Sequence, residues 1–127
     1  MIYLDTHVVA WLYAGFVDLF DAAVMDLINT EALSISPMVV LELDYLNETG
    51  KTSDPGAVVY KDLQNRIGLE LCKKPFAEII FAANSQKWTR DPFDRIIVAQ
   101  AALDASLLVT KDRLIREHYP HAFWNGK

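Results

Sequence analysis

The chain of 127 residues contains a single cysteine, Cys72. One cysteine allows neither an internal disulfide nor a cysteine-based zinc site, and such a chain is typical of the cytoplasm. The sequence also lacks an apolar run long enough to cross a membrane, because charged residues interrupt its hydrophobic stretches. Its N-terminal residues lack the basic stretch of a signal peptide. We therefore expect a cytoplasmic protein without a membrane segment.

Basic residues are scarce in the first half of the chain. Residues 1–60 contain nine acidic side chains and one basic side chain, Lys51, whereas residues 61–127 contain eight acidic and eleven basic side chains. The formal net charge of −5 argues against a polyanionic partner. However, carboxylates that gather around divalent cations make the local field less negative than the formal count. The uneven charge distribution is thus compatible with a nucleic-acid partner without establishing one.

Hydrophobic residues make up 52% of the chain, which is enough for one buried core. Short apolar stretches typical of strands alternate with stretches of helical periodicity. We predict strands at residues 1–4, 33–36, 69–72, 106–110 and 121–124. We predict helices at residues 7–15, 17–31, 36–47, 57–68, 75–84, 92–105 and 111–119. This alternation predicts a single domain over residues 1–127, with a parallel sheet covered by helices on both faces.

Four acidic residues stand at strand ends or on the helices that follow: Asp5, Glu42, Asp94 and Asp112. Parallel sheets place ligands at the carboxyl ends of their strands, so we expect these carboxylates at one edge of the sheet. Oxygen ligands at this density suit Mg²⁺ or Mn²⁺, as one ion or as two ions about 4 Å apart. Such ions lower the pKa of bound water and stabilise charge on a phosphoryl group. The predicted chemistry is metal-assisted phosphodiester hydrolysis.

The segment TRDPFDRIIVAQA, residues 89–101, contains two aspartates three residues apart. Pro92 fits the first helical position, which makes Asp91 the N-cap, a structural position worth about 1 kcal/mol. Asp94 then shares a helix face with the apolar residues three, four and seven positions later. A carboxylate at the top of a buried stripe requires something positive nearby. We therefore favour a functional role for Asp94 and a supporting, structural role for Asp91.

Four segments in this order resemble the PIN-domain ribonucleases: MIYLDTHVVAWL, SISPMVVLELDYL, TRDPFDRIIVAQA and LLVTKDRLI. Within that family, the sequence is most similar to the VapC-type toxins of bacterial toxin–antitoxin pairs, over essentially the whole chain. The resemblance implies a three-layer α/β/α sandwich with a mainly parallel sheet of four or five strands. It also implies Mg²⁺- or Mn²⁺-dependent cleavage of RNA, a homodimer and a cognate antitoxin protein.

The resemblance assigns the catalytic and metal-binding roles to four acids: Asp5, Glu42, Asp94 and Asp112. Thr110 matches a hydroxyl two residues before the last acid, where it holds a ligand or a water in place. Thr6 and Asp91 are expected to support the site. The segment LELD differs from the WEI found around the second acid in close relatives, and Asp44 adds a charge there.

Basic residues cluster in sequence around Asp94 and Asp112. We expect four of them to flank the site and contact RNA phosphates, with ordinary surface charge as an equal alternative. These candidates are Arg90, Arg95, Lys111 and Arg113. His7 follows Asp5 by two residues, and a histidine hydrogen-bonded at the helix start is the favoured interpretation over a catalytic one. The apolar segment around Trp11 predicts either the core or a partner interface.

Other functions remain open at this stage. An RNA-processing nuclease without an antitoxin would share the same fold and acids. A signalling receiver domain also gathers carboxylates around Mg²⁺, but it needs an aspartate at the end of the third strand, where this chain has Cys72. A phosphatase of the haloacid-dehalogenase kind needs a second aspartate at the position of His7. A non-catalytic domain is disfavoured because all four acids are present.

Overall fold

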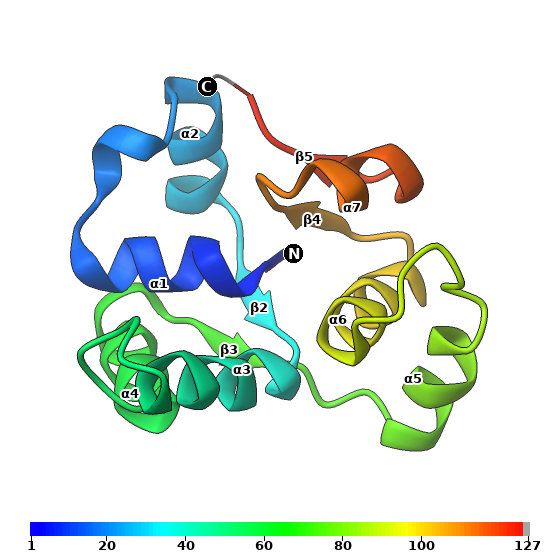
Figure 1. Ribbon diagram of the computed structural model, residues 1–127. Coiled ribbons are helices and arrows are strands. Elements are labelled where there is room, and N and C mark those ends of the chain that lie inside the picture. Colours follow the sequence, from blue (N-terminus) through cyan, green and yellow to red (C-terminus); the bar gives the residue numbers. More distant parts are fainter. Residues whose placement is uncertain (126–127) are drawn as a thin grey trace.

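The computed structural model describes residues 1–125, and its five strands form one parallel sheet with the order β3–β2–β1–β4–β5 (Figure 1). The strands are β1 (Ile2–Leu4), β2 (Leu33–Ile35), β3 (Glu70–Leu71), β4 (Leu107–Val109) and β5 (Ala122–Phe123). The helices are α1 (Thr6–Ala14), α2 (Ala22–Thr30), α3 (Pro37–Glu48), α4 (Gly56–Ile67), α5 (Phe76–Ala83), α6 (Pro92–Ala102) and α7 (Arg113–His118). Helices flank this sheet on both faces. The predicted three-layer α/β/α fold is confirmed.

Polar side chains begin several of the helices. Ser36 precedes Pro37 at the start of α3 and accepts a hydrogen bond from the Met38 backbone N–H. Asp91 caps α6 ahead of Pro92 in the same way. These caps satisfy backbone donors that have no partner inside the helix, which explains why the chain turns into a helix at these residues.

The single helix predicted for residues 17–31 is wrong in one respect. The segment splits into a 3₁₀ turn, η1 (Val17–Leu19), and α2, with Phe20 extended between them. The Asp21 carboxylate accepts a hydrogen bond from the Val24 backbone N–H at 3.0 Å and so caps α2. Asp21 therefore begins a helix, whereas the helix predicted for residues 17–31 placed this residue inside a longer one.

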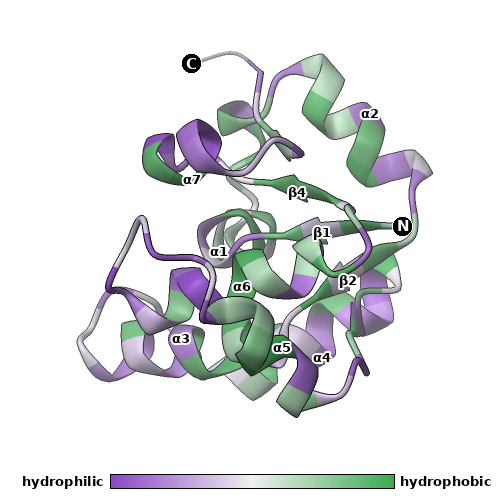
Figure 2. Ribbon diagram, turned by 90° about the vertical axis from the view of Figure 1, so that its right-hand side faces the viewer, coloured by the Kyte–Doolittle hydropathy of each residue, from purple (hydrophilic) through white to green (hydrophobic). Residues whose placement is uncertain are grey.

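The core lies around the central strands β1 and β4. Residues 2–4 are at most 3% exposed, and Leu108 and Val109 are fully buried. Figure 2 shows these strands coloured mainly as hydrophobic residues. In the parallel register Leu4 pairs with Val109, so the residues that follow, Asp5 and Thr110, leave the sheet side by side. This register is what brings together the two ends of the chain at the candidate site.

Helices α3 and α4 approach each other closely near Gly56. A Cβ atom at this position would lie 2.1 Å from the Val40 carbonyl oxygen, so only glycine fits. The Gly56 backbone N–H donates to the Asp44 carboxylate at 2.6 Å. The extra acid in LELD is therefore a structural residue that supports the start of α4. No helix within residues 1–125 is both long and apolar enough to cross a membrane.

Candidate active site

Asp5 lies at the centre of the candidate site. It is the N-cap of α1, and one carboxylate oxygen accepts a hydrogen bond from the Thr6 backbone N–H at 2.8 Å. The other oxygen accepts a hydrogen bond from the Thr110 hydroxyl at 2.6 Å. Asp5 is only 6% exposed, and burial raises its pKa despite these two hydrogen bonds, while the charge of Asp112 raises it further.

Thr110 connects Asp5 with Asp112. Its side chain is fully buried, and its hydroxyl oxygen accepts a hydrogen bond from the Asp112 backbone N–H at 3.1 Å while donating to Asp5. Asp112 is the N-cap of α7, where its carboxylate accepts from the Ile115 backbone N–H at 2.9 Å. One hydroxyl therefore fixes the relative positions of two acids from different strands.

Glu42 reaches the same place from α3. The Thr6 hydroxyl donates a hydrogen bond to Glu42 Oε1, so the residue after Asp5 holds the second acid. Burial raises the pKa of Glu42, and the charges of Asp5 and Asp91 raise it as well. Thr6 itself is fully buried. Both threonines thus donate a hydrogen bond to an acid, and their supporting roles remain predictions.

Asp94 completes the group. It stands in the first turn of α6, above the buried residues Ile97, Val98 and Ala101. Burial raises its pKa from 3.8 to about 7, helped by the negative charges of Asp91, Asp5, Asp112 and Glu42, in that order. The four predicted acids, together with Asp91, are therefore electrostatic neighbours in the folded chain.

Asp91 has a structural position in this group. Its Oδ1 accepts hydrogen bonds from the backbone N–H groups of Phe93, at 2.9 Å, and Asp94, at 3.4 Å. Like Asp5 and Asp112, it is an acid that begins a helix. Its charge nevertheless acts on Glu42 and Asp94, whose pKa values it raises.

The donor chemistry of this group fits a hard divalent cation. Every candidate ligand atom is a carboxylate or hydroxyl oxygen, and a doubly charged ion relieves the mutual repulsion of neighbouring carboxylates. However, within residues 1–125 no three histidine, cysteine or acidic side chains lie close enough to hold one ion together. The oxygens point instead to protein donors, such as the Thr6 hydroxyl bound to Glu42 and the Ile115 N–H bound to Asp112.

The predicted RNA-contacting residues fall into two places. Lys111 lines a hollow of about 220 Å³ together with Asp5 and Asp112, and Arg113 is exposed at the start of α7. Arg90 and Arg95 line a different hollow, between α5 and α6. The Arg95 guanidinium donates to the carbonyl oxygens of Ala83, at 3.1 Å, and Asn84, at 3.3 Å, where α5 ends.

Two aromatic side chains also border the acids: His7, which was considered from the sequence because it follows Asp5, and Trp11, whose place here the sequence did not indicate. His7 and Trp11 line the hollow that contains Asp5 and Asp112, with their ring centres 6.0 Å apart. The helix starts at Thr6, directly after Asp5, so His7 and Trp11 lie one turn apart on the same face of α1. His7 is exposed, and its charge lowers the pKa of Asp5 and of Glu42.

The PIN domain family model matches residues 2–119, a span that includes all four acids. The chain belongs to the PIN domain family. Among solved structures, this PIN domain is similar to a chain of the crystal structure of VapBC2 from Rickettsia felis bound to a DNA fragment from their promoter. The two share 21% sequence identity with a TM-score of 0.69, over 98% of this chain and 100% of that chain. A comparison with curated proteins finds no significant match.

Proposed function

We propose that this PIN domain is a Mg²⁺- or Mn²⁺-dependent endoribonuclease and the toxin of a toxin–antitoxin pair. PIN domains are nucleases, and the similar solved structure is a VapBC complex. The observation that carries the proposal is the convergence of Asp5, Glu42, Asp94 and Asp112: burial raises the pKa of Asp94 to about 7, and the charges of its acidic neighbours add to the effect. Within residues 1–125 none of these four acids forms an ion pair, and a group of carboxylates arranged in this way can receive a cation.

Asp5, Glu42, Asp94 and Asp112 would hold one or two ions, with Asp112 turning from the Ile115 N–H and the other carboxylates using oxygens or lone pairs that their present donors leave free. When bound, such an ion lowers the pKa of a coordinated water and neutralises charge on the phosphoryl group. Thr110 keeps Asp5 and Asp112 in register, and Thr6 keeps Glu42 beside Asp5. The role of the two threonines is to position the acids. The loss of either hydroxyl should therefore lower the activity.

RNA binding is assigned to the surface beside the acids. Lys111, in the hollow with Asp5 and Asp112, and Arg113 on α7 would contact phosphates. The His7 and Trp11 rings border the same hollow and offer a face for an unpaired base. Arg90, near the start of α6, remains a candidate contact. Arg95 remains one too, although its guanidinium already binds the end of α5.

The chain has a groove next to the acids that could accommodate an antitoxin segment. A hollow of about 320 Å³ between α1 and α3–α4 is lined by apolar residues, among them Leu43, Leu46 and Val59. His7 and Trp11 line both this groove and the acidic hollow. A partner segment lying in the groove would therefore extend toward Asp5, which is the arrangement expected of a protein that silences the enzyme.

A second copy of the chain would fit the surface between α3 and α5. Leu41 is 41% exposed and Phe76 is 66% exposed, and both line a hollow with Met38, Ile79 and Ile96. Exposed apolar residues that meet at one hollow favour an interface. None of the four acids lines this hollow.

The experiment that tests the nuclease is cleavage of a labelled single-stranded RNA by the purified chain with Mg²⁺, with Mn²⁺ and with EDTA. We expect cleavage only with metal, and a loss of at least about a hundredfold in Asp5→Asn, because a metal-binding acid is removed. Asp26→Asn, an exposed acid on α2, is the matched control. Cleavage that persists in EDTA, or in Asp5→Asn, contradicts the proposal.

Growth on induction tests the toxin. Wild-type expression should arrest growth, and Asp5→Asn should not. A metal-dependent ribonuclease that leaves growth unchanged would point to the alternative, an RNA-processing nuclease without an antitoxin. A small open reading frame just upstream, encoding a protein with a DNA-binding N-terminal half, would favour the toxin.

A further inference from the structure

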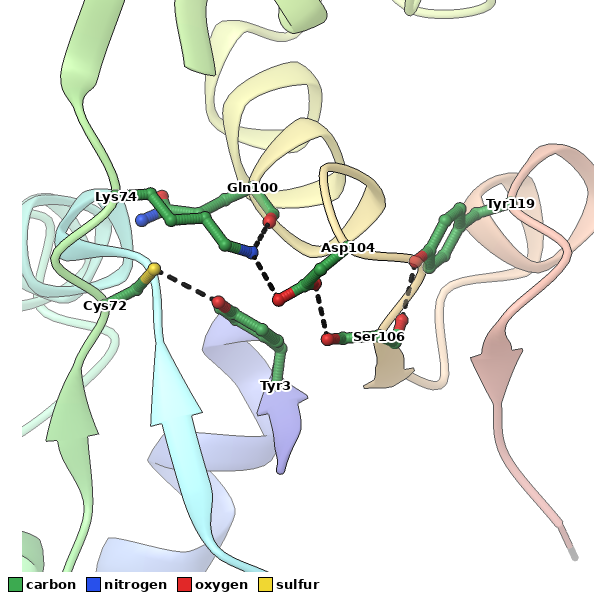
Figure 3. Close-up of polar contacts among 7 residues, drawn as sticks. All are labelled: Tyr3, Cys72, Lys74, Gln100, Asp104, Ser106 and Tyr119. Atoms are coloured by element: carbon green, nitrogen blue, oxygen red, sulfur yellow. Dashed lines mark hydrogen bonds and ion pairs between the residues drawn. The ribbon is translucent and has the colours of Figure 1, made fainter. Parts of the chain in front are cut away.

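A second polar cluster joins β1, the segment after β3 and the end of α6 (Figure 3). The Tyr3 hydroxyl lies 3.0 Å from the Cys72 sulfur, and Lys74 Nζ lies 4.9 Å from the centre of the Tyr3 ring. Lys74 Nζ also donates to the Gln100 main-chain oxygen at 2.8 Å and pairs with Asp104 at 2.9 Å. None of these residues belongs to the acidic site.

The Cys72 thiol is accessible from solvent. It lines a hollow of about 470 Å³ together with Tyr3, Ser34 and Lys74, and its side chain is half-buried. Small reagents can therefore reach the sulfur, while its neighbours hold it in one position. A fixed and partly exposed thiol is the situation in which local charges govern reactivity.

The surroundings of Cys72 favour the thiolate. Burial alone raises the pKa of the thiol, but the Tyr3 hydroxyl, the Lys74 backbone N–H, the nearby Gln100 side chain and the Lys74 ammonium charge bring it below its ordinary value. The Tyr3 pKa is raised, first by burial and then by Cys72, so Tyr3 stays a hydrogen-bond donor.

Gln100 gives the cluster an unusual feature. Its side chain is 1% exposed, and within residues 1–125 neither its amide nitrogen nor its amide oxygen has a hydrogen-bond partner. Figure 3 shows this side chain extending from α6 toward the Cys72 sulfur. A buried amide without partners costs stability, so its presence suggests a partner that is present only in another chemical state of the cluster.

We propose that Cys72 is a modification site at which a peroxide oxidises the thiolate to a sulfenic acid that the Gln100 amide binds. The sulfur attacks one peroxide oxygen, an S–O bond forms and the O–O bond breaks. The sulfur loses two electrons, and the departing oxygen leaves as hydroxide, which solvent protonates to water. The new oxygen on sulfur accepts from Gln100 Nε2, and the sulfenic hydroxyl donates to Gln100 Oε1. The single oxygen atom thus satisfies both unpartnered atoms of the amide.

The test measures oxidation of the full chain by hydrogen peroxide, with dimedone trapping and intact-mass detection. At pH 6, where an ordinary thiol is almost fully protonated, we expect Cys72 to react about tenfold faster than glutathione. Tyr3→Phe and Lys74→Met should each slow the reaction at least about threefold, because each removes a group that stabilises the thiolate. The matched controls are Tyr119→Phe, whose hydroxyl donates to the Ser106 carbonyl, and Lys73→Met.

Melting curves identify any variant that fails to fold. A wild-type rate equal to that of glutathione overturns the proposal, and so does a rate that neither Tyr3→Phe nor Lys74→Met changes. Gln100→Met tests the second half: the sulfenic acid should persist for a shorter time before further oxidation. An unchanged lifetime removes Gln100 from the site.

Discussion

The Thr110 hydroxyl and the Asp5 carboxylate form a 2.6 Å hydrogen bond between residues 105 positions apart. The bond is buried, and Thr110 uses the same hydroxyl to accept from the Asp112 backbone. Because neighbouring strands β1 and β4 end at these residues, this contact connects the first and last acids of the candidate site. It makes Thr110 the residue on which their relative position depends.

Thr110→Val should therefore lower ribonuclease activity by roughly tenfold or more, since valine has the same shape but no hydroxyl to hold either partner. It leaves the Asp112 N–H without an acceptor and Asp5 with one donor fewer, so we also expect a loss of about 1–2 kcal/mol in the free energy of unfolding. Thr110→Ser keeps the hydroxyl and is the control. Activity assays and urea unfolding check both expectations. Equal activity in the valine and serine variants would rule out a positioning role.

Asp94→Asn should stabilise the metal-free protein near neutral pH. The pKa of Asp94 is raised to about 7 in the folded chain, so the folded state binds the proton more tightly than the unfolded chain. Wild-type stability should consequently fall as pH rises from about 4 to 7, and the asparagine variant should lose less over this range. At pH 8 in EDTA we expect a gain of about 1–2 kcal/mol, or several degrees in Tm.

The control for this experiment is Asp26→Asn, because Asp26 is exposed on α2. It should leave the pH dependence of Tm as in the wild type. Parallel Tm curves for wild type and Asp94→Asn between pH 5 and pH 8 would contradict the raised pKa.

Lys111 should contribute to RNA binding through charge. In the cleavage-inactive Asp5→Asn background, Lys111→Gln should lower the slope of log affinity against log salt by about one unit for the loss of one phosphate contact. Lys61→Gln, on the exposed face of α4, should leave the slope unchanged. Fluorescence anisotropy over a series of salt concentrations gives the slopes. Identical slopes for the two variants would show that Lys111 is ordinary surface charge.

Leu41→Glu should disrupt the proposed homodimer by introducing a charge into the hollow between α3 and α5. Leu114→Glu on α7 is the matched control, because Leu41 and Leu114 are 41% and 42% exposed. Light scattering coupled to size exclusion should give a dimer for the wild type and the control and a monomer for Leu41→Glu. A dimer in all three proteins would show that the interface lies on another surface.

Gln100→Met should raise the free energy of unfolding of the reduced protein by about 1 kcal/mol. Methionine fills a similar volume and removes two buried polar atoms that have no partner within residues 1–125. Urea unfolding under reducing conditions measures the change. A stability below that of the wild type would mean that the amide already has a stabilising contact in the reduced state.

The sequence signals were strongest where they were local. Ser36–Pro37 and Asp91–Pro92 specify helix starts within two residues, and α3 and α6 begin where predicted. The same kind of signal was overlooked at Asp21, because a polar residue on a helical face and an N-cap have the same composition until the backbone is known.

Contacts between residues far apart in the sequence were harder to predict. The gathering of the acids was predicted from the rule for strand ends. Two other contacts depend on how α3 packs: the hydrogen bond from the Thr6 hydroxyl to Glu42, and the hydrogen bond that Asp44 accepts at the start of α4. The Tyr3–Cys72 contact spans 69 positions and follows no motif. Such contacts depend on tertiary packing, which periodicity and spacing do not encode.

Three acids of this group, Asp5, Asp91 and Asp112, are also the residues at which α1, α6 and α7 begin. A descendant of this gene that abandoned catalysis would still need an oxygen acceptor at each position to keep three helices from fraying. Drift toward asparagine or serine would be tolerated there, whereas alanine would erode the fold. An inactive copy would thus still carry side-chain oxygens at these three positions, which would indicate its origin.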